Sequence, residues 1–346
     1  MLPLTIYSTA SMTARLFHAA FSLLLLAALP AAAQQAEIVA TQKIWDKSNH
    51  QGFTDLVRFQ NLFYCCFREG ESATKGPGTI RMMLSASGDT WVEHVTLNEA
   101  GVDLRDPKLI VTPDGKRLYL LCAGIAADGG RQSRYCASLD GKVWTPFQKL
   151  LAKGDTLWRV TVNPADNRFF GVSYNIHPNS GGPAPEKEYS LKGYASTDGS
   201  VWQLASLLNV PGQPTETTLR FLKDGTAMAL VNREGGNRLG ALGTAKAPYR
   251  EWTWTPLKQP IGGPNFIELP DGRLIAGSRG FGATPGPHMV LYRMSSAGLD
   301  PLVELPSSGD CSHPGLSWHD GILHVIYYSS HEGGKAAIYH AKVRVK

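Results

Sequence analysis

Ser138-Leu139-Asp140-Gly141-Lys142-Val143-Trp144 is one of three copies of a short motif that decides the fold. The other copies are Ser85-Ala86-Ser87-Gly88-Asp89-Thr90-Trp91 and Ser196-Thr197-Asp198-Gly199-Ser200-Val201-Trp202. Their tryptophans follow one another at intervals of 53 and 58 residues, and a weaker fourth copy spans Gly243 to Trp254. A repeat of this length indicates a chain built from similar structural units.

Each copy has the chemistry of a tight turn between two strands. Asp-Gly favours a hairpin, because glycine tolerates positive φ and the aspartate side chain accepts hydrogen bonds from turn amides. The tryptophan then folds back to cover the turn. Short β-branched and aromatic runs surround the motifs, and no long segment shows helical periodicity. The aspartates of the motif, Asp140 and Asp198, are therefore interpreted as structural.

Four-stranded units repeated around a ring form a β-propeller, whose blades surround a central channel. At the spacing of the motifs, residues 34–346 hold six repeats. A propeller must close on itself, and both ends of this region, Glu37–Ile44 and Ala336–Val345, resemble strands. We therefore predict an all-β chain with one six-bladed propeller domain over residues 34–346, in which the N- and C-terminal strands close one blade.

Residues 1–33 have the pattern of a secretory signal peptide. Arg15 precedes the apolar stretch Ala19 to Leu29, and small residues up to Ala33 mark the expected cleavage site. This stretch is shorter than the roughly 20 residues that span a bilayer. The sequence thus predicts export to the periplasm or the medium, without a membrane span.

Charge and cysteine content argue against several classes of function. The net charge of +5 is spread along the chain without a dense Lys/Arg tract, so nucleic-acid binding is not expected. The five cysteines form no zinc-type pattern, and neither a metal nor another cofactor is expected. Either Cys122 and Cys136 form a disulfide or all five cysteines are small buried apolar residues, which we favour. We expect a monomer.

Further motifs join the repeats in a resemblance to the aspartate-box (BNR-repeat) sialidase superfamily, and specifically to its bacterial exported exo-α-sialidase-like members. The resemblance covers nearly all of residues 34–346 and implies a sialidase-like propeller that acts on a glycan. The additional motifs are Phe53-Thr54-Asp55-Leu56, Phe67-Arg68-Glu69-Gly70, Asp103-Leu104-Arg105-Asp106-Pro107-Lys108, Gly262-Gly263-Pro264-Asn265-Phe266, Pro314-Gly315-Leu316, Trp318-His319-Asp320-Gly321 and Tyr327 to Gly333.

Sialidases of this superfamily bind the substrate carboxylate with three arginines. They use a tyrosine nucleophile, an assisting glutamate and an aspartate acid/base, whereas most glycoside hydrolases use a pair of carboxylates. The resemblance places Glu216 at the glutamate, and Arg233 and Arg279 at the second and third arginines. His313 falls where the tyrosine is expected. It can act as a general base, bind the substrate or be structural.

The first half of the family's site is altered in this sequence. The early Arg-Ile-Pro motif is replaced by Phe53-Thr54-Asp55, and the loop Glu69 to Lys75, where the aspartate is expected, contains no aspartate. Asp55 and Glu69 are the early carboxylates best placed to protonate a leaving group instead. Tyr328 or Tyr174 could replace the missing phenol, although core packing is the expected role of both.

Arginines near strand ends make an anionic ligand the expected partner, because a guanidinium matches a carboxylate or sulfate in a bidentate manner. Inner strands line the channel of a propeller, so arginines at matching blade positions can converge on one pocket. The alternative is that each pairs with a nearby acid. The candidates for substrate binding are Arg68, Arg105, Arg159, Arg233 and Arg279.

Three functions fit these observations. We favour an exo-acting glycoside hydrolase that removes a terminal acidic sugar, sialic acid or a similar one, from a glycan. The second is a non-catalytic glycan-binding propeller that has lost the tyrosine nucleophile. The third is a protein-interaction scaffold, because propellers host unrelated functions.

Overall fold

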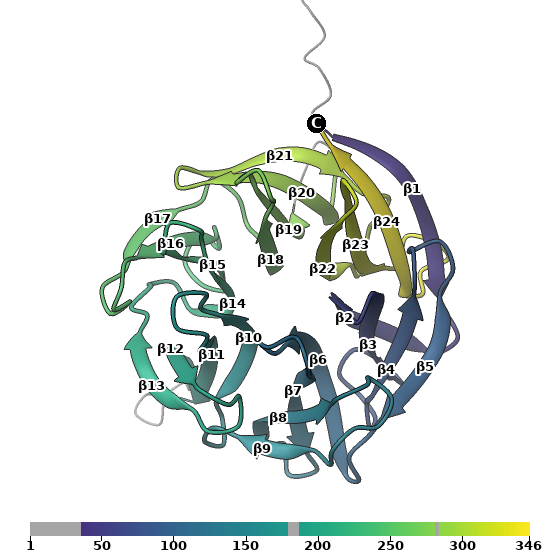
Figure 1. Ribbon diagram of the computed structural model, residues 1–346, viewed down its shortest axis with the longest axis horizontal. Coiled ribbons are helices and arrows are strands. Elements are labelled where there is room, and N and C mark those ends of the chain that lie inside the picture. Colours follow the sequence, from purple (N-terminus) through teal and green to yellow (C-terminus); the bar gives the residue numbers. More distant parts are fainter. Residues whose placement is uncertain (1–35, 179–186, 281–283) are drawn as a thin grey trace, which may run out of the picture. The chain divides into compact units, whose positions relative to one another are not determined.

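The structure, a computed structural model, describes residues 36–178, 187–280 and 284–346, so the expected signal peptide lies outside the described residues. All regular elements of the described ranges are strands, and they form six four-stranded sheets arranged as blades around a centre (Figure 1). The prediction of a six-bladed propeller is confirmed. No helix that could cross a membrane occurs in the described ranges.

In blades 1 to 5 the strands run outward from the centre in chain order. Blade 1 contains β2 (His50–Phe59), β3 (Leu62–Gly70), β4 (Thr79–Ser85) and β5 (Val92–Leu97); blade 2 contains β6 (Val102–Val111), β7 (Leu118–Ala126), β8 (Arg131–Ser138) and β9 (Gln148–Leu150). Blade 3 contains β10 (Thr156–Val162), β11 (Phe169–Pro178), β12 (Lys187–Ser196) and β13 (Gln203–Leu207).

The remaining blades repeat this order. Blade 4 contains β14 (Pro214–Phe221), β15 (Ala227–Arg233), β16 (Ala241–Ala245) and β17 (Thr253–Pro256); blade 5 contains β18 (Gly262–Glu268), β19 (Leu274–Gly280), β20 (His288–Ser295) and β21 (Gly298–Glu304). Blade 6 contains β22 (Ser312–His319), β23 (Ile322–Ser329), β24 (Ala337–Val345) and, as its outer strand, β1 (Ala36–Trp45).

Blade 6 closes the ring with strands from both ends of the described chain. β1 pairs antiparallel with β24, from Ala36 opposite Val345 to Trp45 opposite Ile338. The predicted completion of one blade by the two terminal strands is therefore confirmed.

The repeated motifs form the expected turns between the third and fourth strands of blades 1 to 3. In the second copy, Asp140 Oδ1 accepts hydrogen bonds from the amides of Lys142 (2.8 Å) and Val143 (2.9 Å). Trp144 Nε1 donates to the carbonyl of Gly141 at 2.9 Å, and Gly141 has a φ of 72°. The first copy has Ser87 in place of the aspartate, and this side chain accepts only the Asp89 amide. These turns lie at the end of the propeller opposite to the start of the inner strands.

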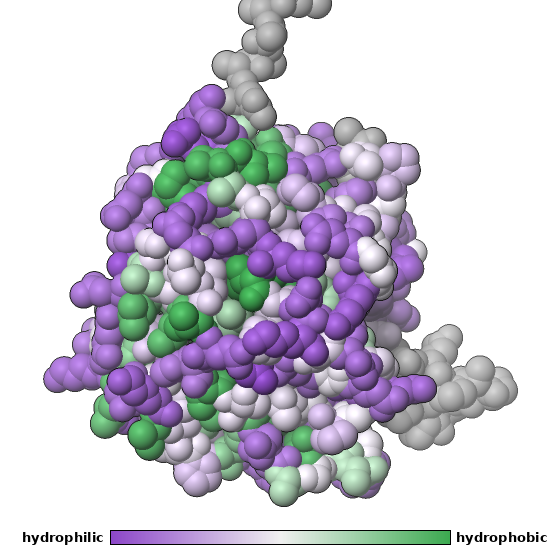
Figure 2. All heavy atoms as spheres, turned by 90° about the vertical axis from the view of Figure 1, so that its right-hand side faces the viewer, coloured by the Kyte–Doolittle hydropathy of each residue, from purple (hydrophilic) through white to green (hydrophobic). Residues whose placement is uncertain are grey.

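The apolar core lies between adjacent blades. One such cluster joins blades 1 and 2 through residues that include Tyr64, Met82, Leu104 and Leu120. All five cysteines are buried and free, which agrees with their interpretation as apolar core residues. On the side of the propeller that bears β1 and β5, the surface is largely hydrophilic and its hydrophobic areas are separate (Figure 2).

Every inner strand has a β-bulge close to its start, at one mouth of the channel. Two residues of the inner strand lie opposite one residue of the second strand, as between the pairs Gly52–Arg68 and Asp55–Cys66 in blade 1. A bulge of this kind redirects side chains. The residues in the bulges are Phe53 and Thr54, Asp106 and Pro107, Leu157 and Trp158, Thr215 and Glu216, Gly263 and Pro264, and His313 and Pro314.

Candidate active site

His313 and Glu216 meet at the mouth of the channel. His313 Nε2 lies 3.3 Å from Glu216 Oε1, and the Gly263 amide donates to Glu216 Oε2 at 2.7 Å. Burial alone would raise the pKa of Glu216, but the His313 hydrogen bond, with smaller effects of the Gly263 amide and Arg279, lowers it to about 2. Glu216 is therefore an ionised carboxylate over the whole range of physiological pH.

Aromatic side chains from three other places in the ring enclose His313. Its ring centroid lies 5.1 Å from those of Phe53 and Trp158 and 5.8 Å from that of Tyr328. Only 5% of His313 is exposed, and its φ of 51° follows from its position in the bulge of β22. The imidazole is thus held in one orientation.

Asp106 faces the other nitrogen of the same imidazole. Its Oδ1 lies 3.9 Å from His313 Nδ1, and Arg131 contacts the second oxygen at 3.1 Å. Arg131 also donates to the hydroxyl of Tyr174 at 2.9 Å. Neither Asp106 nor Arg131 was among the site residues predicted from the sequence. One signal in the sequence could have identified Asp106. Asp106, His313 and Gly263 are each followed by a proline, and each occupies the same bulge position of its strand.

Arg233 and Arg279 line one cavity of about 430 Å³ beside this pair. Arg233 donates to the Leu239 carbonyl, the Pro211 carbonyl (3.2 Å) and Asn237 Oδ1 (3.0 Å), all of them neutral acceptors. Among the described residues, no carboxylate lies within ion-pair distance of Arg279. Asn232, which also lines the cavity, reaches Glu216 Oε2 at 3.4 Å. The cavity therefore presents two guanidiniums without carboxylate partners next to Glu216.

Arg68 and Arg105, in contrast, share one carboxylate. Arg68 Nε donates to Asp103 Oδ1 at 2.9 Å, and Arg105 Nε donates to Asp103 Oδ2 at 2.7 Å. Arg68 is fully buried, and its remaining donors bind the carbonyls of Ser72 (2.6 Å) and Lys75 (3.2 Å). Unlike Arg233 and Arg279, both are ion-paired with a carboxylate, so their geometry lends no support to the expectation that they bind substrate.

The prediction that all five arginines occupy matching blade positions is wrong, because only three of them do. Arg68, Arg233 and Arg279 do, because each pairs with the residue just before the bulge of its inner strand. Arg105 and Arg159 lie on the inner strands themselves. In blades 3 and 6, tyrosines take the position of the three arginines: these are Tyr174 and Tyr328.

The two early carboxylates are held in ionic contacts. Asp55 is fully buried and accepts from Arg159 Nη1 (2.8 Å) and the Leu109 amide (2.9 Å). Glu69 accepts from Trp45 Nε1 at 2.8 Å and from Arg81 Nε at 2.6 Å. Neither is placed beside the cavity as an acid for a leaving group, and Arg159 is bound to Asp55 below the channel mouth.

The tyrosine hydroxyls are poorly placed for nucleophilic attack. Tyr328 is 2% exposed, and burial, with a smaller contribution from Asp310, raises the pKa of its hydroxyl. Burial likewise raises the pKa of Tyr174. Both rings serve as packing, which is the role predicted for them from the sequence.

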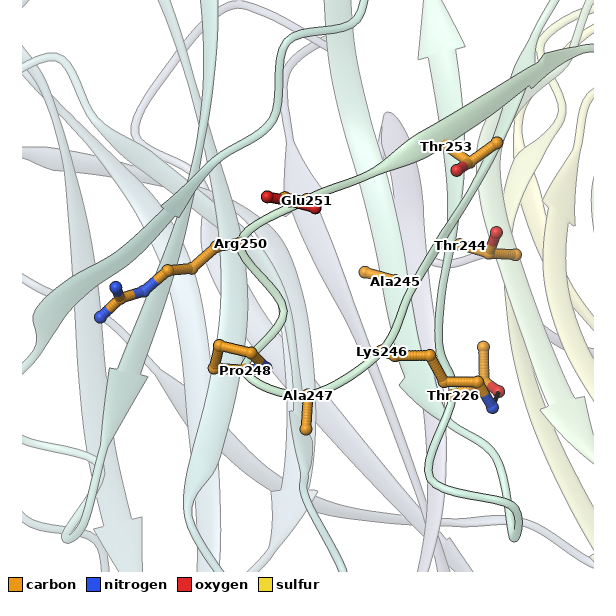
Figure 3. Close-up of a pocket in the computed structure, with 9 residues that line it drawn as sticks. All are labelled: Thr226, Thr244, Ala245, Lys246, Ala247, Pro248, Arg250, Glu251 and Thr253. Carbon is orange, nitrogen blue, oxygen red and sulfur yellow. Dashed lines mark hydrogen bonds between the residues drawn. The ribbon is translucent and has the colours of Figure 1, made fainter.

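Another cavity, of about 490 Å³, lies away from this site (Figure 3). Its lining comes from the turn after β14 and the connection between β16 and β17, at the end of the propeller that bears the repeated turns. Figure 3 shows Arg250 pointing away from Lys246 and Thr226, so its charged groups do not converge. We regard the mouth with His313 and Glu216 as the candidate site.

No protein-family model and no curated protein matches the sequence. Solved structures share its fold: a protein of unknown function from Dyadobacter fermentans has a TM-score of 0.78 at 16% identity, over 90% of this chain and 100% of that one. An α-L-arabinofuranosidase from Fusarium graminearum has a TM-score of 0.67 at 14% identity, over 90% of this chain and 98% of that one.

A sialidase from Trypanosoma rangeli, solved with the inhibitor DANA, has a TM-score of 0.65 at 10% identity. The match covers 85% of this chain and 55% of the sialidase chain. At such identities the comparisons establish a common six-bladed architecture, to which sialidases and an arabinofuranosidase belong.

Proposed function

We propose that this protein is an exo-acting glycoside hydrolase of the sialidase-like type, which removes a terminal acidic sugar such as sialic acid from a glycan. The observation that carries the proposal is the 3.3 Å contact between His313 and Glu216 beside a cavity lined by Arg233 and Arg279. The carboxylate–imidazole pair provides a proton-transfer group, and the two guanidiniums provide recognition of a carboxylate.

The roles of the pair follow from its electrostatics. Glu216 stays ionised, so it stabilises the positive charge that develops on the sugar ring as the glycosidic bond breaks. His313 gives a proton to the leaving oxygen. Water then adds to the anomeric carbon and returns one proton to His313, so the products are the free acidic sugar and the shortened glycan.

Asp106 is a positioning residue in this proposal. Its carboxylate, held by Arg131, faces His313 Nδ1 and leaves Nε2 directed at Glu216. The aromatic rings of Phe53 and Trp158 exclude water from the sides of the imidazole. The two carboxylates lie on opposite nitrogens of the ring and therefore favour its protonated form, which is the form that can give up a proton.

A second candidate function is a glycan-binding propeller without catalysis. The observation that favours it is the burial of Tyr328 and Tyr174, which leaves neither phenol available as a nucleophile. In this case Arg233 and Arg279 bind the acid group, and His313 donates a hydrogen bond to the sugar.

The two candidates are separated by assaying wild-type protein and Glu216→Gln against fluorogenic sialosides, uronides and neutral pentofuranosides, with Glu251→Gln as the control. Glu251 is an exposed carboxylate in the cavity of Figure 3. Hydrolysis of an acidic substrate that falls at least about 100-fold in Glu216→Gln alone supports the hydrolase. Equal turnover in the wild type and Glu216→Gln would contradict the proposed hydrolase mechanism.

If no turnover is found, two interpretations remain, and calorimetric titration with sialic acid and glucuronic acid distinguishes them. Binding without hydrolysis supports the non-catalytic propeller. Neither binding nor hydrolysis supports the protein-interaction scaffold and overturns both glycan proposals.

We also propose that residues 1–33 direct export and that the mature chain is a monomer. The basic residue, apolar stretch and small residues before Gln34 support the first part. Mass spectrometry of protein from the periplasm and the medium should give a chain that begins at Gln34. Light scattering at working concentration should give the mass of one chain, and a dimer mass would overturn the second part.

A further inference from the structure

A ring of six residues, five of them polar, lies inside the channel, directly after the six bulges. Its members are the first paired residues beyond each bulge, and all six are buried. The members are Asp55, Lys108, Arg159, Thr217, Asn265 and Gly315. Trp158 separates this channel ring from the candidate active site, because its side chain contacts both Lys108 and His313.

Lys108 is a buried cation without a carboxylate partner among the described residues. It is fully buried, and its ammonium donates to the adjacent Pro107 carbonyl at 3.1 Å. The same ammonium lies 4.5 Å from the centroid of the Trp158 ring. Two of its three N–H donors have no protein acceptor among the described residues. An unpaired buried charge of this kind is costly unless a counter-charge accompanies it.

Two further cations approach the same place. Arg159, 5% exposed, donates through Nη1 to Asp55, but its buried Nε has no partner among the described residues. Arg220, on the same strand as Thr217, donates to the Phe266 carbonyl and Asn265 Oδ1, both at 3.1 Å. Burial and the charge of Arg159 lower the pKa of both Lys108 and Arg220.

Asp55 is the single carboxylate that contacts this group in the described structure. Both of its oxygens are occupied, one by Arg159 and one by the Leu109 amide. The charge of Asp106 also acts on Lys108, but Asp106 makes no ion pair with it and is itself bound by Arg131. Three cations therefore share one contacting carboxylate, and unused N–H donors outnumber the available acceptors. Donors in excess and a net positive charge in a buried place are the chemistry of an anion site.

We propose that the channel ring binds a small inorganic anion of halide size between Lys108, Arg159 and Arg220. A monoatomic anion accepts the unused donors from all three side chains and offsets their mutual repulsion. Because these groups lie below Trp158 rather than in the cavity of Arg233 and Arg279, the site is separate from the proposed substrate site. Its occupancy stabilises the folded propeller, since the unfolded chain cannot assemble it.

Bromide tests the proposal, because it scatters anomalously and replaces other halides. We expect an anomalous peak between the three cations in wild-type crystals soaked in bromide. At constant ionic strength, replacing gluconate by bromide should raise the midpoint of thermal unfolding by several degrees in a saturable manner. Lys108→Met should abolish this shift, whereas Lys149→Met, at an exposed lysine on blade 2, should retain it.

A wild-type map without bromide in the channel would overturn the proposal, and so would an equal anion-specific shift in Lys108→Met. If Lys108→Met does not fold, the wild-type anomalous map decides alone. None of these readouts depends on glycan hydrolysis, so this proposal and the proposed function fail separately.

Discussion

His313 Nε2 and Glu216 Oε1 lie 3.3 Å apart although 97 residues of chain separate them. The two residues occupy the bulges of β22 and β14, and the bulge of β18 lies between them. Gly263 in that bulge has no side chain, and a Cβ there would lie 2.0 Å from His313 Cδ2. The contact therefore depends on a glycine in a third blade.

Gly263→Ala should separate this pair. The added methyl group displaces the imidazole, and we expect hydrolysis to fall by at least about 10-fold, or ligand affinity if the protein only binds. Gly321→Ala is the matched control, since Gly321 also has a positive φ (77°) but nothing within 4 Å of its Cβ position. Equal activity in the two variants would contradict the role of Gly263.

Arg279→Met should weaken the recognition of acidic sugars. A hydrogen bond to a charged group is worth ~1.5–3 kcal/mol, so KM for an acidic substrate should rise about 10-fold or more while kcat changes less. Arg238 lines the same cavity but pairs with Glu234 at 3.4 Å, so Arg238→Met should have the smaller effect. A loss of the same size on the methyl ester of the substrate would show that Arg279 does not read the carboxylate.

Acid should destabilise the fold through two buried histidines of blade 6. Burial, with Lys342, lowers the pKa of His324 to about 4, and burial, with His324, lowers that of His340 to about 3. Their rings are joined by a hydrogen bond of 3.1 Å. In the unfolded chain both take up protons near pH 6.5, so the unfolded state binds more protons below that value and stability falls as pH falls towards 4.

Urea unfolding at a series of pH values checks this expectation. His340→Gln should give a smaller loss of unfolding free energy between about pH 7 and pH 4 than the wild type, because one of the two buried titrations is removed. An unchanged pH slope in this variant would refute the assignment.

Asp140→Ala should lower the free energy of unfolding, because it removes the acceptor that holds the Lys142 and Val143 amides in the turn. Ser87→Ala, at the equivalent position of the first copy, should cost less, since Ser87 accepts a single turn amide. Hydrolysis or binding should be unchanged in both variants, because these turns lie at the end of the propeller opposite to His313. Equal free energies of unfolding for the two variants would contradict this account.

The fold was accessible from the sequence because its decisive signals are local. Ser138 to Trp144 makes its turn with hydrogen bonds between residues two or three positions apart, and the spacing of the copies reports the number of blades. The closure of blade 6 could be predicted because the two terminal strands must pair if the ring is complete.

The candidate site was accessible only in part, because its contacts join residues far apart in the chain. Glu216, His313, Arg233 and Arg279 were selected, and the structure brings them to one mouth of the channel. The environment of Asp55 was not predictable, because its partner Arg159 lies 104 residues away. The same holds for Arg131, whose contact with Asp106 depends on the bulge of β6.

The pairing of β1 with β24 has a consequence for how the molecule forms. Ala36 is among the first residues of the propeller to be synthesised, and its partner Val345 is among the last. Blades 1 to 5 can assemble in succession from local hairpins, but blade 6 must wait until the whole length is available. A polypeptide stopped short of β24 is therefore an open arc with unpaired edges at both ends, and protease digestion of nascent chains of graded length should show protection of β1 only at the final step.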